Sequence, residues 1–248
     1  MQIGKAGEPV PRISRASPDR IEVRGRDLTG DLMGRLTFTE YFHLLLTGEE
    51  PSVEQRDFLD LLLVSIAEHG MMPTNVAARM TLAADPGSLQ GAVAAGILGA
   101  GPVVLGTSEE CARLLASGRD ATEIAREIRA AGNRVPGFGH PVHAPLDPRA
   151  ERILELADER GVSGRHVELA RELRDAVVAE WGRELTMNVS LPIAAVMLDL
   201  DFPPAAVKAV PILARTAGLL AHLAEERERP LGFVLAEGAE NAVRYEQE

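Results

Sequence analysis

One glycine-rich segment of the chain brings a histidine, an aspartate and an arginine close together. Residues 135–141 read VPGFGHP and residues 147–149 read DPR. Asp147 followed by Pro148 predicts the start of a helix, which places Arg149 in a first turn where backbone N–H groups favour an anion. An arginine fork beside an imidazole donor can bind a carboxylate. The pattern predicts a carboxylate site at His140 and Arg149; the alternative is a turn histidine and a solvated arginine.

The same segment also offers metal ligands in the order H-x-x-H. His140 and His143 would need Asp147 as a third ligand, but zinc ligands at this spacing usually lie on a helix or beside cysteines. Pro141 and Pro145 disrupt any helix in this segment. We therefore expect no bound metal. Ser-His-Asp hydrolysis is not supported either, because no serine lies in a G-x-S-x-G turn.

Three other reactive side chains lie in predicted helices. His69 comes at the end of an apolar helical segment before Gly70, where an imidazole pairs favourably with the helix dipole. His222 lies in an apolar helical segment, and its simplest interpretation is a packed residue. Cys111 is the only cysteine, which excludes an intrachain disulfide, and we expect it to be an inert core thiol.

Composition limits the class of protein. The 248 residues are 46% hydrophobic and 25% charged, with a formal net charge of −11, so a disordered chain and a coiled-coil rod are excluded. The acidic charge without a basic run argues against nucleic-acid binding. Residues 1–11 lack the apolar core of a signal peptide, and glycines and a proline interrupt the long uncharged stretch at 86–108. We expect a cytoplasmic protein that does not interact with a membrane.

Helical periodicity dominates the elements that must position these residues. Phe58, Leu61, Leu62 and Ile66 recur at helical spacing, after a Ser52-x-x-Gln55 capping pattern. Residues 88–98 form a predicted helix of small side chains that lets a neighbouring backbone come close. Only residues 20–24 alternate as a strand, so the expected class is all-α. Further helices are predicted at 120–131, from 147 onward, and at 164–181, 191–200, 204–215 and 216–229.

Four ordered segments resemble the motifs of the citrate synthase superfamily, and the likeness extends from about Arg24 to Pro230. They are PGFGHPV with DPR, EHG at 68–70, SLQGAVAAG at 88–96 with GP at 101–102, and ARTAGLLAH at 214–222. The resemblance implies a two-domain helical fold. Residues 1–105 and 205–248 would form the large domain and residues 106–204 an inserted small domain. It also implies a homodimer whose active-site clefts close by domain motion.

Two positions depart from the synthase pattern. Citrate synthases carry a histidine in G-P-L-H-G, where this chain has Val104, and an aspartate in N-V-D, where it has Ser190. In the family that aspartate is the base for the methyl proton of acetyl-CoA, and the histidine stabilises the enolate. In lacking this histidine, the chain resembles stand-alone citryl-CoA lyases and the C-terminal module of ATP-citrate lyase. In its short length it resembles the stand-alone lyases.

The resemblance implies cleavage of citryl-CoA, or of a related 3-hydroxy-3-carboxyacyl-CoA, to acetyl-CoA and oxaloacetate. No cofactor would be tightly bound, since the coenzyme A thioester is itself a substrate. The other ligand would be a dicarboxylate or tricarboxylate. The resemblance implies that His140 contacts the hydroxyl that becomes the ketone and accepts its proton. His69, Arg149 and Arg215 would bind the carboxylates, and Ser190 would occupy the base position. Coenzyme A would bind at Gly137, Phe138 and Gly139.

Two other functions remain open. One is a condensing enzyme that acts on an unusual acyl-CoA. The other is a catalytically silent protein that binds coenzyme A or a dicarboxylate, which the residues at Val104 and Ser190 favour. Retention of the cationic groups favours an enzyme, because a silent site has no reason to keep all of them. The sequence does not identify the physiological acyl chain, the direction of reaction or the group that handles the enolate proton.

Overall fold

A computed structural model describes residues 10–101 and 107–246 of the chain. The chain divides into two units, Met1–Asp60 and Leu61–Glu248. Helices make up most of the described residues, and the named strands all lie in the first unit. The predicted all-α class is therefore confirmed.

The first unit combines a small sheet with short helices. Strand β2 (Ile21–Val23) lies between β1 (Ser14–Ala16) and β3 (Arg26–Asp27), antiparallel to both. The predicted strand at 20–24 is β2, whereas its two partners were not predicted. A short π-helical turn, η1 (Leu28–Leu32), and helix α1 (Phe38–Thr47) follow, and α2 (Val53–Ala67) continues into the second unit. The capping pattern expected before α2 is present, because Gln55 N–H donates to Ser52 Oγ at 3.1 Å.

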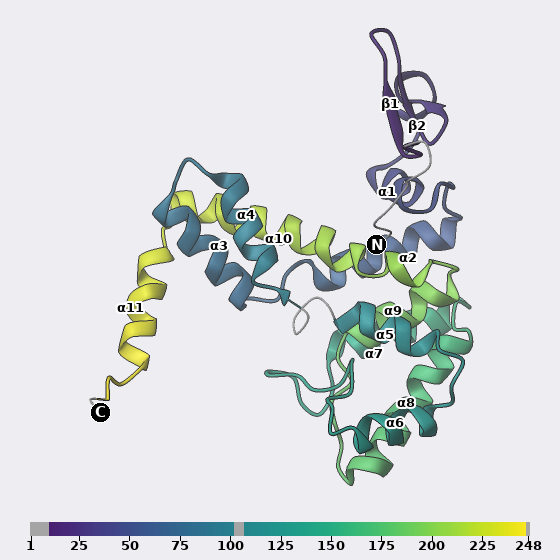
Figure 1. Cartoon of the computed structure of the whole chain (residues 1–248), viewed down its shortest axis with the longest axis vertical. Coiled ribbons are helices and arrows are strands. Elements are labelled where there is room, and N and C mark those ends of the chain that lie inside the picture. Colours follow the sequence, from purple (N-terminus) through teal and green to yellow (C-terminus); the bar gives the residue numbers. More distant parts are fainter. Residues whose placement is uncertain (1–9, 102–106, 247–248) are drawn as a thin grey trace, which may run out of the picture. The chain divides into compact units, whose positions relative to one another are not determined.

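Small residues allow close packing between three helices of the second unit (Figure 1). They are α3 (Pro73–Ala84), α4 (Leu89–Leu98) and α10 (Ala209–Glu228), and α11 (Gly232–Ala242) packs on α3. A Cβ added at Gly96 would lie 2.7 Å from a methyl group of Leu219, so a larger residue would require the Leu219 side chain to move. The predicted small-residue helix is confirmed by α4.

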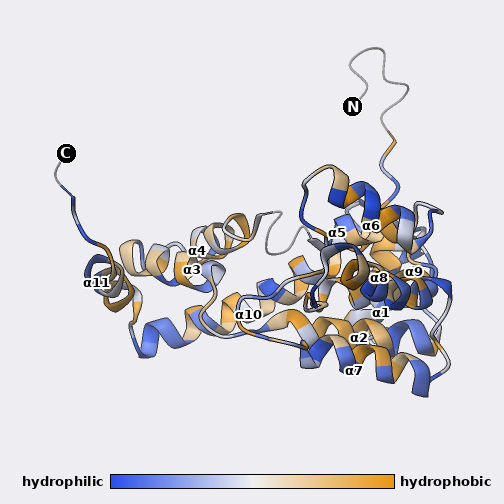
Figure 2. Ribbon diagram, turned by 90° about the horizontal axis from the view of Figure 1, so that it is seen from below, coloured by the Kyte–Doolittle hydropathy of each residue, from blue (hydrophilic) through white to orange (hydrophobic). Residues whose placement is uncertain are grey.

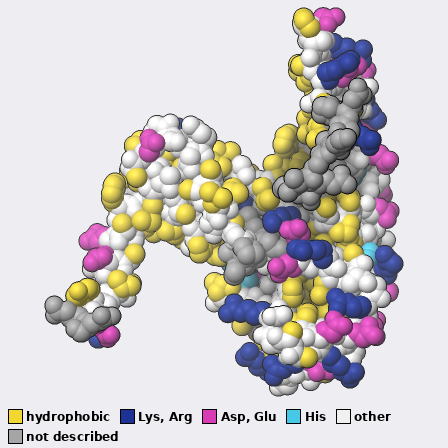
Figure 3. Space-filling model, in the orientation of Figure 1, with side chains coloured by type: hydrophobic (Ala, Val, Ile, Leu, Met, Phe, Trp, Pro, Cys, Tyr) yellow, Lys and Arg dark blue, Asp and Glu magenta, His cyan; other side chains and the backbone are white. Residues whose placement is uncertain are grey.

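A second group of helices surrounds α9 (Ser190–Asp199), in which the residues from Ser190 to Leu198 are all buried. Helices α5 (Thr107–Leu115), α7 (Pro148–Glu159) and α8 (Arg165–Trp181) pack against it. Asp120 and Asp147 cap α6 (Ala121–Ala130) and α7 as predicted. On the face shown in Figure 3, charged side chains are numerous over this group and sparse over α3 and α4. The group consists of α5, α6, α7, α8 and α9.

The prediction of two helices at 204–215 and 216–229 was wrong. A short 3₁₀ turn, η3 (Pro204–Ala206), precedes one continuous helix, α10. Pro211 lies in the first turn of α10, where a missing N–H removes no intrahelical hydrogen bond. Thr216 does not interrupt the helix, because its hydroxyl donates to the carbonyl of Ile212 at 2.8 Å.

The segment Pro204–Glu228 is long and apolar enough to cross a membrane by length and composition alone. The hydropathy colouring shows apolar residues along α10 and a hydrophilic C-terminal end (Figure 2). Half of its most apolar window is buried in the structure. The segment packs against α3 and α4, which accounts for its apolar character.

One departure from the synthase pattern, Val104, lies outside the described residues. The predicted domain boundary between residues 105 and 106 lies there too, so the division into 1–105 with 205–248 and 106–204 remains a prediction.

Candidate active site

The glycine-rich loop is held against the segment that leads into α9. Gly139 N–H donates to the carbonyl of Thr186 at 2.7 Å, and Asn188 N–H donates to the carbonyl of Gly137 at 2.8 Å. The side-chain amide of Asn188 also donates to the carbonyl of Gly139 at 3.0 Å. Gly137 has φ +81°, and a Cβ there would lie 2.7 Å from the Cβ of Leu191. These contacts fix the backbone from which His140 extends.

The hydrogen bonds of His140 determine its tautomer. Its Nδ1 accepts backbone N–H groups from Val142 at 3.1 Å and from His143 at 2.8 Å. A neutral imidazole has one nitrogen lone pair, so Nε2 carries the proton. Burial lowers the pKa of His140 and so favours this neutral form, although the negative charge of Asp147 acts in the opposite direction. In this tautomer Nε2–H of His140 can donate to a ligand oxygen, whereas the sequence-based expectation was that His140 accepts a proton.

Asp147 orients Arg149 beside His140. The buried carboxylate accepts from Arg149 Nε at 3.0 Å and from Nη2 at 2.7 Å, and it also caps α7 at the N–H of Arg149. Burial alone would raise the pKa of Asp147, but the hydrogen bonds and charge of Arg149 hold it below its usual value. Asp147 further accepts the N–H of Val189 at 3.2 Å. One carboxylate therefore joins the start of α7 to the residue before α9.

Arg215 and His69 complete the cationic side of the site. Arg215 is 3% exposed, and its Nε and Nη1 have no hydrogen-bond partner in the described parts of the chain. Its Nη1 lies 4.0 Å from a carboxylate oxygen of Glu68. Burial lowers the pKa of Arg215, and burial together with Arg149 and the other cationic groups lowers the pKa of His69. A buried guanidinium with open donors is costly unless an anion binds to it.

A buried network behind the site holds Glu68 in place. Arg79 is fully buried and donates to His222 Nδ1 from Nε at 3.1 Å and from Nη2 at 2.7 Å. His222 Nε2 therefore carries its proton, and it lies 3.0 Å from Glu68. Burial would raise the pKa of Glu68, but this hydrogen bond keeps it below its usual value. From the sequence, His222 was expected to be a packed residue, and neither Glu68 nor Arg79 was expected to form a hydrogen-bonded network with it.

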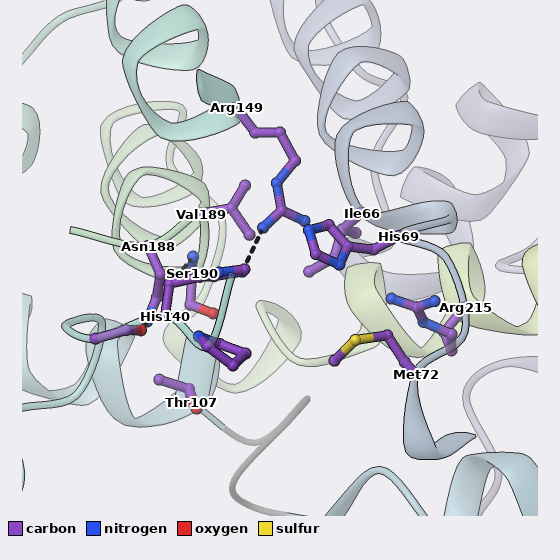
Figure 4. Close-up of a pocket in the computed structure, with 12 residues that line it drawn as sticks. Ile66, His69, Met72, Thr107, His140, Arg149, Asn188, Val189, Ser190 and Arg215 are labelled. Carbon is purple, nitrogen blue, oxygen red and sulfur yellow. Dashed lines mark hydrogen bonds between the residues drawn. The ribbon is translucent and has the colours of Figure 1, made fainter. Parts of the chain in front are cut away.

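The side chains of His69, His140, Arg149 and Arg215 line a cavity of about 190 Å³ (Figure 4). It contains most of the residues predicted from sequence, whereas Gly137 is packed behind it and Phe138 pairs with Met187. Asn188 lines the cavity and was missed. Among the described residues the lining contains no carboxylate. The lining residues are Ile66, His69, Met72, Thr107, Gly139, His140, Pro141, Arg149, Asn188, Val189, Ser190 and Arg215.

Three imidazoles lie close enough to consider a metal. One nitrogen from each of His69, His140 and His143 lies within 4.8 Å of the others. The lone pair of His140 already accepts two backbone N–H groups, and a ligating nitrogen needs a free lone pair. Asp147, the third ligand considered from sequence, is occupied by Arg149. The donor set therefore fits an oxyanion better than a cation.

Residues 14–231 match the family described as citrate synthase, C-terminal domain. The chain belongs to the citrate synthase family. It is 31% identical to citrate synthase of Synechocystis over 201 residues, which are 77% of this chain and 50% of that protein. Putative citrate synthase 2 of Mycobacterium tuberculosis is 33% identical over 189 residues, 72% of this chain and 49% of that protein. The chain spans about half the length of these curated relatives.

Solved structures extend the comparison. Citryl-CoA lyase from Hydrogenobacter thermophilus superposes with a TM-score of 0.86 at 29% identity, covering 98% of this chain and 96% of that one. ATP citrate lyase from Methanothrix soehngenii, in complex with citrate and coenzyme A, gives 0.79 at 20% identity over 99% of this chain and 43% of that chain. The second likeness shows a shared fold, which confirms the helical architecture implied by the motifs.

Proposed function

We propose that the protein is a carbon–carbon lyase that cleaves citryl-CoA, or a related 3-hydroxy-3-carboxyacyl-CoA, to an acyl-CoA and a 2-oxo acid. The observation that carries the proposal is the cavity itself. It gathers His69, His140, Arg149 and Arg215, and it also includes Ser190, which the family resemblance assigns to the position of the carboxylate base. Such a site can stabilise several negative oxygens but contributes no carboxylate base from the described lining.

Each donor has a part in binding a polycarboxylate. Arg215 offers Nε and Nη1, and Asp147 leaves Nη1 of Arg149 for a ligand. His69 lies beside both guanidinium groups. Nε2–H of His140 donates to the oxygen that is a hydroxyl in the thioester and a ketone in the product. Oriented donors of this kind stabilise charge that develops on oxygen during the reaction.

The absence of a carboxylate from the described lining favours cleavage over condensation. Condensation requires removal of a weakly acidic methyl proton, and a serine hydroxyl is a poor base near neutral pH. Cleavage generates the same enolate by breaking a carbon–carbon bond, after which the enolate only needs to gain a proton. Ser190 is 7% exposed and lines the cavity, where its hydroxyl can donate a hydrogen bond to the thioester.

The comparisons support a lyase and also define the second candidate. The likeness to a citryl-CoA lyase covers nearly the whole of both chains, which favours cleavage. The curated relatives are citrate synthases, which favours a condensing enzyme. Coenzyme A would approach along Gly137, Phe138 and Gly139. A homodimer, the inserted small domain and a cytoplasmic location remain predictions that accompany this proposal.

The test is to incubate the purified protein with citryl-CoA and follow oxaloacetate through a coupled NADH-dependent dehydrogenase. We expect oxaloacetate release that Arg149→Gln lowers strongly. Arg152→Gln is the matched control, because Arg152 lies on the same helix but pairs with Glu155 and Glu159 on the surface. No release by the wild type across several hydroxyacyl-CoA thioesters would refute the lyase. Faster formation of citrate from acetyl-CoA and oxaloacetate would favour the condensing enzyme.

A further inference from the structure

A third histidine, His143, joins the site without lining its cavity. Its ring stacks on His140, with ring centroids 4.4 Å apart and an angle of 28° between the planes. Its Nε2 lies 3.0 Å from Nε2 of His69. From the sequence, His143 was expected to be at most a metal ligand. His143 thus contacts His69, which does line the cavity.

The tautomer of His140 leaves the cleavage reaction in need of a proton acceptor. The tertiary hydroxyl must lose its proton as the carbon–carbon bond breaks. Neutral His140 has its proton on Nε2 and its lone pair engaged by Val142 and His143 N–H, so it donates to this oxygen and cannot take the proton from it. Ser190 is too weak a base to serve instead. The imidazole of His69 is the remaining neutral nitrogen base among the described lining residues.

The contact between His69 and His143 suits the pair to hold one added proton. At 3.0 Å one Nε2 donates to the other, and an added proton makes this hydrogen bond charge-assisted. A second proton would set two N–H groups against each other at the same distance, so the pair accepts one. The charged and titratable groups around the pair are of both signs. They are His140 in the loop, Asp147 and Arg149 at α7, Glu68 after α2, and Arg215 and His222 on α10.

We propose that His143 is a proton-relay residue, which shares with His69 the proton that leaves the substrate hydroxyl. This inference rests on the proposed lyase function. In the step, the O–H bond breaks and an N–H bond forms on His69, while the electrons of the O–H bond form the ketone. The electrons of the carbon–carbon bond pass to the thioester enolate. The proton held by the pair then forms the new methyl C–H bond, so the reaction needs no external acid or oxidant.

The first arm of the test is kinetic. His143→Ala should lower kcat about 100-fold with little change in KM, because His143 acts through His69 and does not bind the substrate. Added imidazole should restore turnover to His143→Ala, with rescue that increases as the free-base fraction rises. Val142→Ala is the matched control, since this exposed side chain belongs to the same loop, and imidazole should leave it unchanged. A kcat within about threefold of wild type, or a loss that imidazole does not restore at any pH, would overturn the relay.

The second arm needs no turnover and separates the relay from the lyase function. In ¹⁵N-histidine-labelled wild type, the resonances of His69 and His143 should titrate together as one proton is taken up. His143→Ala should abolish this coupled step while the folded spectrum is kept. Independent titrations of the two imidazoles would overturn the relay. Coupled titration in a protein that fails to cleave citryl-CoA would refute the lyase function alone.

Discussion

Arg149 Nη2 lies 3.3 Å from Nε2 of His140, although both groups are hydrogen-bond donors. Nε2 carries a proton because Nδ1 accepts two backbone N–H groups, and a guanidinium has no acceptor. Two donors held this close share a single acceptor well, such as the oxygen of a carboxylate or ketone. The pair is positioned by Asp147 on one side and by the loop backbone on the other.

The donor role of His140 is tested by comparing two substitutions. His140→Asn can keep an acceptor near the position of Nδ1 for the loop N–H groups but removes the Nε2 donor, whereas His140→Ala removes both. We expect both variants to lose about 10²- to 10⁴-fold in turnover. Only His140→Ala should also lower the melting temperature. Near wild-type turnover in His140→Asn, measured by oxaloacetate release, would contradict the assigned role.

Arg215 is predicted to bind a carboxylate at the expense of stability. Arg215→Met should weaken citrate or oxaloacetate binding by roughly 1.5–3 kcal/mol, the usual value of a charge-assisted contact. Binding of free coenzyme A should change little. The melting temperature of the unliganded variant should equal or exceed that of wild type, because a buried guanidinium with two unpartnered nitrogens is removed. Calorimetry that shows the larger loss for coenzyme A would refute this assignment.

Carboxylate binding should be coupled to proton uptake. Burial lowers the pKa values of His69 and His140, so in the free protein the neutral form of both imidazoles is favoured. A bound carboxylate favours the charged imidazole and raises these pKa values. Titration calorimetry of citrate near pH 6, in buffers of different ionisation enthalpy, should show uptake of a fraction of a proton that disappears towards pH 8. Proton release would contradict the electrostatics of the site.

Asp147 is expected to contribute to stability in its ionised form. Its folded-state pKa is below the usual value, so its stabilising effect is present above about pH 4 and is lost as pH falls through the lowered pKa. Asp147→Asn should therefore cost about 1–3 kcal/mol in urea unfolding at pH 7, and less at pH 3. Asp120→Asn is a matched helix-cap control at an exposed position. Equal costs of Asp147→Asn at both pH values would rule out the ionised pair as the cause.

Local signals in the sequence predicted much of the fold. Asp120, Asp147 and the Ser52–Gln55 pair mark helix starts through side-chain hydrogen bonds that depend only on neighbouring residues. The break predicted between Arg215 and Thr216 is absent because the Thr216 hydroxyl donates to the carbonyl of Ile212 within the helix, which lets α10 continue. The partners of β2 were missed because strands of two or three residues carry too little alternation to detect.

The closeness of His140 and Arg149 was predicted from a local pattern, that of His69 and Arg215 to them followed only from the family resemblance, and the long-range contacts beside the site were missed. His140 and Arg149 are nine positions apart, and the loop brings them together. The link from Arg79 through His222 to Glu68 joins positions more than a hundred residues apart, and no local pattern indicates it. The tautomer of His140 depends on backbone N–H groups, which every residue type except proline supplies.

Replacement of Ser190 by aspartate tests the identity of this position. Ser190→Asp should raise oxaloacetate-dependent exchange of the acetyl-CoA methyl protons with D₂O, because it returns a carboxylate base to the cavity lining. Ser190→Asn is the isosteric control and should not raise exchange. The rates are followed by proton NMR of the methyl signal. Equal exchange in the aspartate and asparagine variants would show that Ser190 does not occupy the base position.

The isotopic composition of the acetyl-CoA formed from citryl-CoA in D₂O tests the lyase proposal most directly. Cleavage yields an enolate that gains a single deuterium. With Ser190 in place of the carboxylate base of the family, renewed deprotonation of the methyl group should be slow compared with cleavage. Mass spectrometry should therefore find citryl-CoA consumed and its acetyl-CoA product carrying one deuterium, which persists on longer incubation with oxaloacetate. Acetyl-CoA with two or three deuterium atoms would reveal a synthase-like base, and unchanged citryl-CoA would show that the protein is not this lyase.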